Sequence, residues 1–209
     1  MPRSETMKAI AESMKKAGAA FRERDIPFLL AGSLASWARG GPETSHDLDF
    51  VVKPEDADRA LEAAGMKTER PPEEWLYKAW DGEVLIDIIF HPAGLRPDDD
   101  VMTRGDTLSV MSMEIPVMAI EDVLVTKLNA LTAHSLRYEG LLDISRALRE
   151  QIDFAKVRER ARDTPFVRAY FVMLDGLGIA SVPDAEPEAD AKPGGGDDEP
   201  RVRVDVSTA

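Results

Sequence analysis

Two aspartates stand at alternate positions of segment 47–52, Asp-Leu-Asp-Phe-Val-Val. Side chains alternate between the two faces of a strand, so a strand here places Asp47 and Asp49 on one face and Leu48 and Phe50 toward a core. Carboxylates held close together repel one another unless a cation lies between them. Mg²⁺ takes one or two carboxylates together with phosphate oxygens and water, so the pair predicts a magnesium site, with Mn²⁺ as the alternative ion.

A third carboxylate, Asp87, stands inside the apolar segment 84–90. An ionised carboxylate is costly to bury alone, so Asp87 must be paired, hydrogen-bonded or metal-bound. If its strand lies beside that of Asp47 and Asp49, the three acids can hold two metal ions about 4 Å apart, a geometry for nucleotidyl transfer. We therefore predict that these three residues bind metal and are catalytic. The alternative for Asp87 is an ion pair with a structural arginine or lysine.

Gly32 follows an apolar segment, 28–31, and Ser33 begins a short helical segment, 33–39. Glycine lets a phosphate approach the backbone, and Ser33 can donate a hydrogen bond to phosphate oxygens. A Gly-Ser pair is common at strand-to-helix turns and does not by itself indicate a phosphate site. Its position shortly before the acids is what favours a phosphate-binding role. Gly32 and Ser33 are therefore predicted to bind the phosphates of a nucleoside triphosphate.

The order of these motifs resembles the DNA polymerase beta-type nucleotidyltransferase superfamily: strand, Gly-Ser, helix, Asp-x-Asp on a strand, then one Asp in an apolar strand. Segments 120–128 and 141–144 are similar to its AbiEii and MenT-type branch, which contains toxins of bacterial toxin-antitoxin and phage-defence systems. The resemblance covers residues 28–144. It implies an enzyme that moves a nucleoside monophosphate from a nucleoside triphosphate to an acceptor hydroxyl and releases pyrophosphate.

The same resemblance implies two further site residues. Lys127, on the first helix after the sheet, is expected to be catalytic and to bind the nucleotide, and Asp143, on the next helix, is expected to bind the nucleotide. Lys127 also stands one helical turn from Val123 and Leu131, on the inward stripe, where a lysine needs an anionic partner. The alternative for Lys127 is an apolar stem on the core with its charge in water. The alternative for Asp143 is a surface pair with Arg146. Both alternatives stay open.

Periodicity and turn residues predict the elements that position these side chains. Helices are expected at 4–24, 33–39, 55–64, 120–132, 138–150, 154–161 and 166–177. Strands are expected at 28–31, 48–52, 75–80, 84–90 and 108–113, whereas 115–118 extends the sheet or leads out of it. The Asp-Gly pair at 81–82 predicts an antiparallel hairpin, and the three aspartates at 98–100 a solvated loop.

These elements predict an α/β nucleotidyltransferase fold with a mixed β-sheet flanked by helices. We expect a nucleotidyltransferase core at 1–118, a helical subdomain at 119–178 and a disordered acidic tail at 179–209. The 209 residues include no cysteine, which excludes disulfides, cysteine-bound zinc and a thiol nucleophile. No apolar run reaches the roughly 20 residues that cross a bilayer, so we expect a cytoplasmic protein with no membrane partner.

The net charge of −13 argues against a broadly basic nucleic-acid surface, although a local basic groove is compatible with it. The acceptor stays open between tRNA, a protein and a small molecule, and the protein partner between an antitoxin and a toxin. Two other functions stay open: an antibiotic nucleotidyltransferase of the aminoglycoside type, and a non-catalytic nucleotide-binding or antitoxin partner protein. Arg137 is a candidate phosphate contact or surface ion pair, and His46 is expected to shape the loop before the Asp-x-Asp strand.

Overall fold

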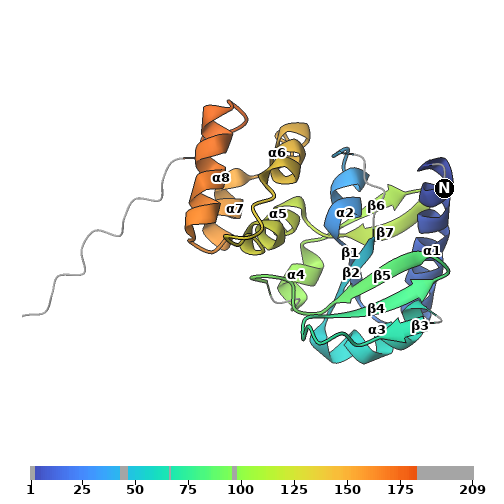
Figure 1. The fold of residues 1–209 in the computed structure, drawn as a ribbon. Helices are drawn as coiled ribbons and strands as arrows, with labels where there is room; N and C mark the ends of the chain where they lie inside the picture. The colour runs from blue at the N-terminus through green and yellow to red at the C-terminus, as the bar shows by residue number, and fades with distance from the viewer. Residues whose placement is uncertain (1–2, 43–46, 66, 96–97, 183–209) are drawn as a thin grey trace, which may run out of the picture.

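A single mixed sheet forms the centre of the computed structural model, which describes residues 3–42, 47–65, 67–95 and 98–182. Within these residues the sheet has seven strands in the order β3-β4-β5-β2-β1-β7-β6 (Figure 1). The strands are β1 Phe28–Leu30, β2 Leu48–Val52, β3 Lys67–Glu69, β4 Leu76–Asp81, β5 Val84–Ile89, β6 Asp106–Val110 and β7 Met113–Val117.

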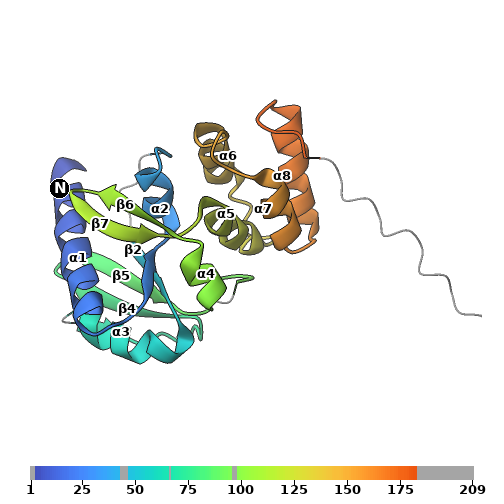
Figure 2. The ribbon, with the colours of Figure 1, turned by 180° about the vertical axis from the view of Figure 1, so that it is seen from behind.

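Some helices cover one face of the sheet, and others form a separate group at one end of it. Helices α1 and α3 pack against each other on one face, and α5 to α8 form the group beside α2 (Figures 1 and 2). The helices are α1 Arg3–Glu23, α2 Gly32–Ala38, α3 Ala57–Ala64 after the 3-10 turn η1 Pro54–Asp56, α4 Asp99–Thr103, α5 Ile120–Asn129, α6 Tyr138–Ala147, α7 Phe154–Arg160 and α8 Pro165–Gly176. None of the helices in the described ranges combines the length and apolar character that a membrane span requires.

The alternation of apolar and polar side chains explains how the sheet is layered. Leu48 and Phe50 of β2 are fully buried, as are Ile86 and Ile88 of β5. Strands β2 and β5 are parallel neighbours, and β4 and β5 form the predicted antiparallel hairpin. The core therefore lies on the face that α1 and α3 cover, and the acidic residues of β2 and β5 lie on the other face.

Three features differ from the predicted elements. The aspartate run does not form a loop, because Asp98 caps α4 by accepting a hydrogen bond from the backbone N–H of Val101 at 3.1 Å. Carboxylates are favourable at a helix start, where backbone N–H groups are free. Strand β3 was not predicted, since its three residues are all exposed and lack apolar alternation. The strand predicted at 108–113 ends earlier, since β6 ends at Val110 and β7 begins at Met113. Segment 115–118 extends the sheet, one of its two expected outcomes, because most of it belongs to β7, which pairs with β1 in parallel.

Two predictions lie wholly or mostly outside the described residues. His46 falls in the segment 43–46, and residues 183–209 make up most of the predicted acidic tail. Both stay predictions.

A buried ion cluster joins the group of α5 to α8 to the segment after α4. Asp122 of α5 is fully buried. It accepts hydrogen bonds from Arg104 Nε at 3.0 Å and from Arg160 Nη1 of α7 at 3.1 Å. Removing one partner of a buried ion pair leaves an uncompensated charge, which is strongly destabilising.

We predict that Asp122→Ala lowers the free energy of unfolding by about 3–5 kcal/mol, because two arginines lose their shared carboxylate. Urea unfolding followed by circular dichroism measures the change. Asp175→Ala, at an exposed position of α8, is the matched control and should unfold like the wild type. A loss below about 1 kcal/mol, the value of a surface pair, would contradict the role assigned to this cluster.

Candidate active site

The predicted catalytic acids come together on the face of the sheet opposite α1 and α3. Asp49 of β2 and Asp87 of β5 are register partners in parallel strands, so their side chains leave the sheet on the same side. Asp47 lies two residues before Asp49 and is exposed. Burial raises the pKa of Asp49 to about 7; the charges of Asp87 and Asp47 act in the same direction and that of Lys127 opposes them. The side chains of Asp87, Asp47 and Lys127 therefore lie within electrostatic reach of Asp49.

Asp87 carries a buried oxygen that has no hydrogen-bond partner. Its Oδ1 atom is enclosed and unpaired in the described part of the chain. Burial raises the pKa of Asp87, the ammonium of Lys78 lowers it, and Asp47 raises it. No ion pair within 4 Å joins Asp87 to a basic side chain among the described residues, so the structural ion pair that was its alternative is not formed there. A buried polar atom without a partner is costly, and such atoms are often explained by an absent ion or ligand.

Gly32 lies against the carboxylate of Asp49. Its backbone has a φ of +61°, and a Cβ atom placed on it would lie 1.7 Å from Asp49 Oδ2. The backbone N–H of Ala31 donates to the carbonyl oxygen of Asp49 at 2.9 Å, which holds β1 and β2 together at this point. The absence of a side chain at Gly32 thus leaves room for the Asp49 carboxylate, a role that the sequence did not indicate.

If the chain transfers nucleotidyl groups, as its sequence predicts, Gly32→Ala should lower that activity by at least about 100-fold, because the new methyl group displaces the Asp49 carboxylate. Gly178→Ala is the matched control: Gly178 also has a positive φ, +64°, but a Cβ there would meet nothing within 4 Å. Both variants carry the backbone strain of alanine at positive φ, about 1 kcal/mol. Initial rates of the two variants separate strain from displacement, and equal rates would contradict the contact.

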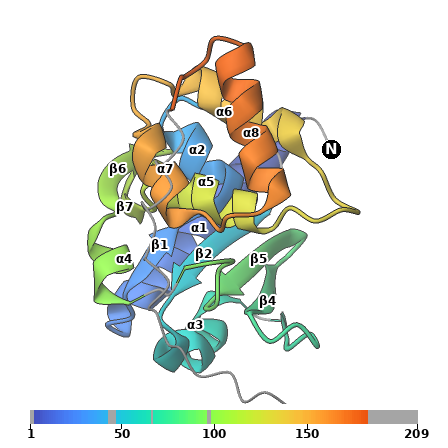
Figure 3. The ribbon, with the colours of Figure 1, turned by 90° about the vertical axis from the view of Figure 1, so that its left-hand side faces the viewer.

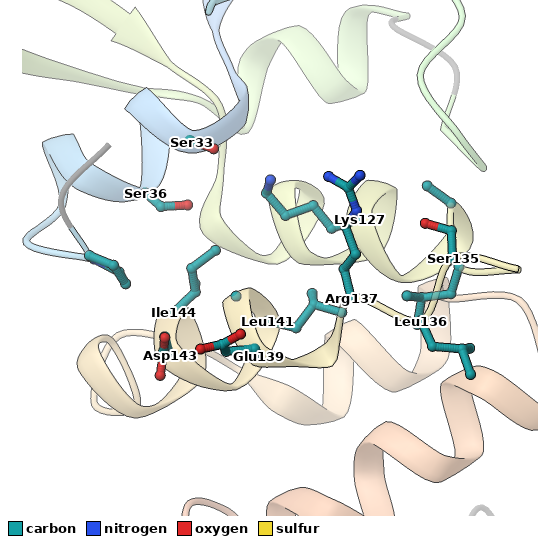
Figure 4. Close-up of a pocket in the computed structure, with 14 residues that line it drawn as sticks. Ser33, Ser36, Lys127, Ser135, Leu136, Arg137, Glu139, Leu141, Asp143 and Ile144 are labelled. Carbon is teal, nitrogen blue, oxygen red and sulfur yellow. The ribbon is translucent and has the colours of Figure 1, made fainter. Parts of the chain in front are cut away.

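A cavity of about 900 Å³ lies between α2, α5 and α6 (Figure 4). This is the size of a pocket for a drug-sized ligand. Figure 4 shows Lys127 and Arg137 pointing their cationic ends toward the side on which Ser33 lies. Burial lowers the pKa of Lys127, whereas Asp49 raises it. The three acids do not line this cavity. Lys127 links the acids to the cavity, because its side chain lines the cavity and its charge acts on Asp49.

Asp143 lies at the rim of this cavity, on α6. Its carboxylate is half exposed and forms an ion pair with Arg146 at 3.2 Å, the surface pair that was the alternative in the sequence. Glu139, one turn earlier, is exposed and also lines the cavity. The rim therefore carries acidic groups, whereas the side near Ser33 carries cations.

The donor set fits a hard divalent cation. Among the described residues no group of three or more histidine, cysteine, aspartate or glutamate side chains is arranged so that it could hold a metal ion. Magnesium sites need fewer protein ligands, because phosphate oxygens and water complete the shell. The unpaired Oδ1 of Asp87 and the raised pKa of Asp49 are both relieved by a cation beside them. Asp49 and Asp87 are therefore the residues that would hold such a cation, and the exposed Asp47 stays a predicted ligand.

Comparison with known structures identifies the fold. The crystal structure of ANT(2'')-Ia in complex with adenylyl-2''-tobramycin matches with a TM-score of 0.54 and 14% identity, over 78% of this chain and 97% of that one. The solution structure of ANT(2'')-Ia matches with a TM-score of 0.54 and 15% identity, over 80% and 94%. The chain has the nucleotidyltransferase fold. No family model and no curated protein matches the sequence.

The nucleotidyltransferase fold brings to the acids one more residue, which was not among the predicted site residues. Lys78 of β4 is the register partner of Asp87 across the hairpin. The hairpin signal at Asp81-Gly82 was sufficient to predict this neighbour. A two-residue turn that pairs Asp81 with Val84 also pairs Lys78 with Asp87. Side chains of such directly opposed residues are neighbours on one face.

Proposed function

We propose that the protein is a metal-dependent nucleotidyltransferase that moves a nucleoside monophosphate from a nucleoside triphosphate to an acceptor hydroxyl. The observation that carries the proposal is the register of Asp49 and Asp87, which sets a buried oxygen without a partner beside an acid of raised pKa. Perturbed acids next to a cavity are typical of functional sites. The fold, which other nucleotidyltransferases share, supports the same proposal.

Each residue then has a defined role. Asp47 and Asp49 would hold magnesium on the triphosphate, and Asp87 would hold a second ion and take the proton of the acceptor hydroxyl. Bound magnesium neutralises negative charge on the phosphate oxygens. Ser33 and Lys127 bind the β and γ phosphates.

Arg137, Gly32 and Asp143 complete the proposed nucleotide site. Arg137 points the same way as Lys127 and adds a second cation for the triphosphate. Gly32 keeps the Asp49 carboxylate in place, and Asp143 supports the nucleotide from the rim of the cavity. The acceptor oxygen forms a bond to the α phosphorus, the bond from that phosphorus to the bridging oxygen breaks, and pyrophosphate leaves toward Lys127.

Two further proposals concern the domain boundaries of the chain and its biological role. We propose a core of residues 1–118 and a helical subdomain of residues 119–178, with the nucleotide between them. The similarity of segments 120–128 and 141–144 to AbiEii and MenT-type toxins favours a toxin with an antitoxin partner. Expression of the wild type should then arrest bacterial growth, whereas the catalytically inactive Asp87→Asn variant should not. Equal growth of both strains would remove the toxin proposal.

An antibiotic acceptor is the second candidate. The matching structure of ANT(2'')-Ia holds adenylyl-2''-tobramycin, and this chain covers 97% of it. The net charge of −13 and the exposed Glu139 at the cavity rim favour a cationic acceptor.

Label transfer tests the proposed function and separates these acceptors. The protein is incubated with Mg²⁺ and each α-³²P nucleoside triphosphate, together with total tRNA, a protein extract or tobramycin. We expect label on one acceptor class, and no label when EDTA removes the metal. Nucleotide binding without transfer to any acceptor would instead support the non-catalytic partner protein.

A further inference from the structure

The three acids divide the uncovered face of the sheet into two sides. The strand order places β1, which leads into Ser33 and the cavity, on one side of β2 and β5, and places β4 and β3 on the other. In an in-line displacement, the attacking and the leaving oxygens lie on opposite sides of the phosphorus. If pyrophosphate leaves toward Lys127, the acceptor must approach over β4 and β3. This step rests on the proposed function.

Side chains on β4 and β3 continue the row of Asp87 across this side of the sheet. Lys78 is opposite Asp87, Trp80 follows two residues later on the same face, and Lys67 of β3 is opposite Trp80. Lys78 and Trp80 are partly exposed, and Lys67 is exposed. Figure 1 shows β4 and β5 with no helix in front of them, whereas α1 lies on the far side, as Figure 2 shows from behind. Figure 3 shows α5 to α8 above β2, β5 and β4.

A hollow of about 490 Å³ opens at this place. It is lined by Lys67, Trp80, Gly82 and Glu83. The ammonium of Lys67 lies 5.0 Å from the centroid of the Trp80 ring. Lys78 forms no ion pair with any residue in the described ranges, although Glu69 is its register partner on β3. The hollow thus combines a partly exposed indole with one lysine, Lys67. Lys78 does not line it, but lies on the same face two residues before Trp80 and opposite Asp87.

This combination selects a particular ligand chemistry. A planar ring stacks on an indole, and ammonium groups bind phosphate. A polycationic acceptor would instead meet Lys67 and Lys78 at the place where it must approach Asp87. Glu83 at the rim is exposed and solvated, and is the one acid that lines the hollow.

We propose that Lys67, Lys78 and Trp80, which we call the acceptor face, bind a nucleotide unit of the acceptor. Its base stacks on Trp80 in place of the Lys67 ammonium, its phosphate contacts the two lysines, and its sugar hydroxyl reaches Asp87. The unit can belong to a free nucleotide or to the end of a single-stranded RNA, since both present the same base, phosphate and hydroxyl.

Fluorescence of Trp80 tests the acceptor face without any catalysis. The full chain with Trp37→Phe and Trp75→Phe keeps Trp80 as its one tryptophan. This protein is titrated, without triphosphate and with EDTA, with AMP, with a single-stranded hexaribonucleotide and with tobramycin. We expect saturable quenching by the nucleotide probes. Binding of the hexamer at least tenfold tighter than that of AMP identifies an RNA end, and equal affinities identify a free nucleotide.

Lys67→Glu should weaken this binding at least tenfold. Lys8→Glu makes the same charge change at an exposed position of α1, on the other face of the sheet, and should leave the binding unchanged. Circular dichroism checks that both variants fold.

Three outcomes would overturn the acceptor face: absence of quenching, equal binding by the Lys67→Glu and Lys8→Glu variants, and tighter binding of tobramycin than of the hexamer. Label transfer that Lys67→Glu leaves unchanged would also overturn it, while the proposed function stands. Quenching as expected, with no label transfer to any acceptor, would contradict the proposed function and leave the binding face established.

Discussion

Asp87→Asn should abolish nucleotidyl transfer, with a loss of at least about 1,000-fold, while the chain still folds. The substitution removes a charge and barely changes the volume of the side chain. The Oδ1 atom of Asp87 is buried with no hydrogen-bond partner, so the negative charge destabilises the folded chain when no cation is bound. A residue that costs stability in the free protein is expected where function requires it.

The measurement compares initial rates of label transfer with thermal unfolding of the same preparations. Asp175→Asn, on the surface of α8, is the control and should keep both the rate and the unfolding temperature of the wild type. If Asp87→Asn fails to fold, Asp87 is a structural acid. If the variant folds and keeps the wild-type rate, its catalytic role is wrong.

Asp49→Asn should change how stability depends on pH. The pKa of Asp49 is about 7 in the folded chain and 3.8 in the unfolded chain. At pH values between 3.8 and about 7, the carboxyl group of Asp49 is ionised in the unfolded chain but still protonated in the folded chain. The free energy of unfolding of the wild type therefore falls as the pH rises through this range. Asparagine does not titrate. The variant should therefore gain about 2–3 kcal/mol on the wild type between pH 5 and pH 8 in EDTA.

Urea unfolding at several pH values between 5 and 8 measures this gain. Added Mg²⁺ should stabilise the wild type at pH 8 and have little effect on Asp49→Asn, because metal binding favours the ionised carboxylate. Asp175→Asn should follow the wild type at each pH. Parallel pH profiles of Asp49→Asn and the wild type would show that the charges of Asp87, Asp47 and Lys127 do not act on Asp49 as described.

The sequence predicted the parts of the fold that local patterns specify. Alternation at 47–52 separated the buried Leu48 and Phe50 from the acids, and the hairpin signal predicted the pairing of β4 with β5. Resemblance and helical spacing together indicated Lys127, which the structure places near Asp49. These features follow from periods of two or of about 3.6 residues, which a sequence displays directly.

The remaining features depend on tertiary contacts or on weak local signals. Strand β3 has no apolar face and is defined by its pairing with β4. Asp98 was assigned to a loop because its charge suggested solvent, whereas its side chain caps a helix. The cavity lies between α2, α5 and α6, and the position of α6 across from Ser33 cannot be obtained from spacing along the chain. The contact between Gly32 and the Asp49 carboxylate is likewise a tertiary one.

We expect Asp47, Asp49 and Asp87 to bind divalent metal together with the triphosphate. Crystals grown with Mn²⁺ and a nucleoside triphosphate analogue that carries an α,β-methylene bridge test it most directly, since the anomalous signal of manganese locates the ion. We predict a manganese peak at the carboxylates of Asp49 and Asp87, with the analogue's phosphates extending toward Lys127. A bound analogue whose manganese lies away from these carboxylates would contradict it.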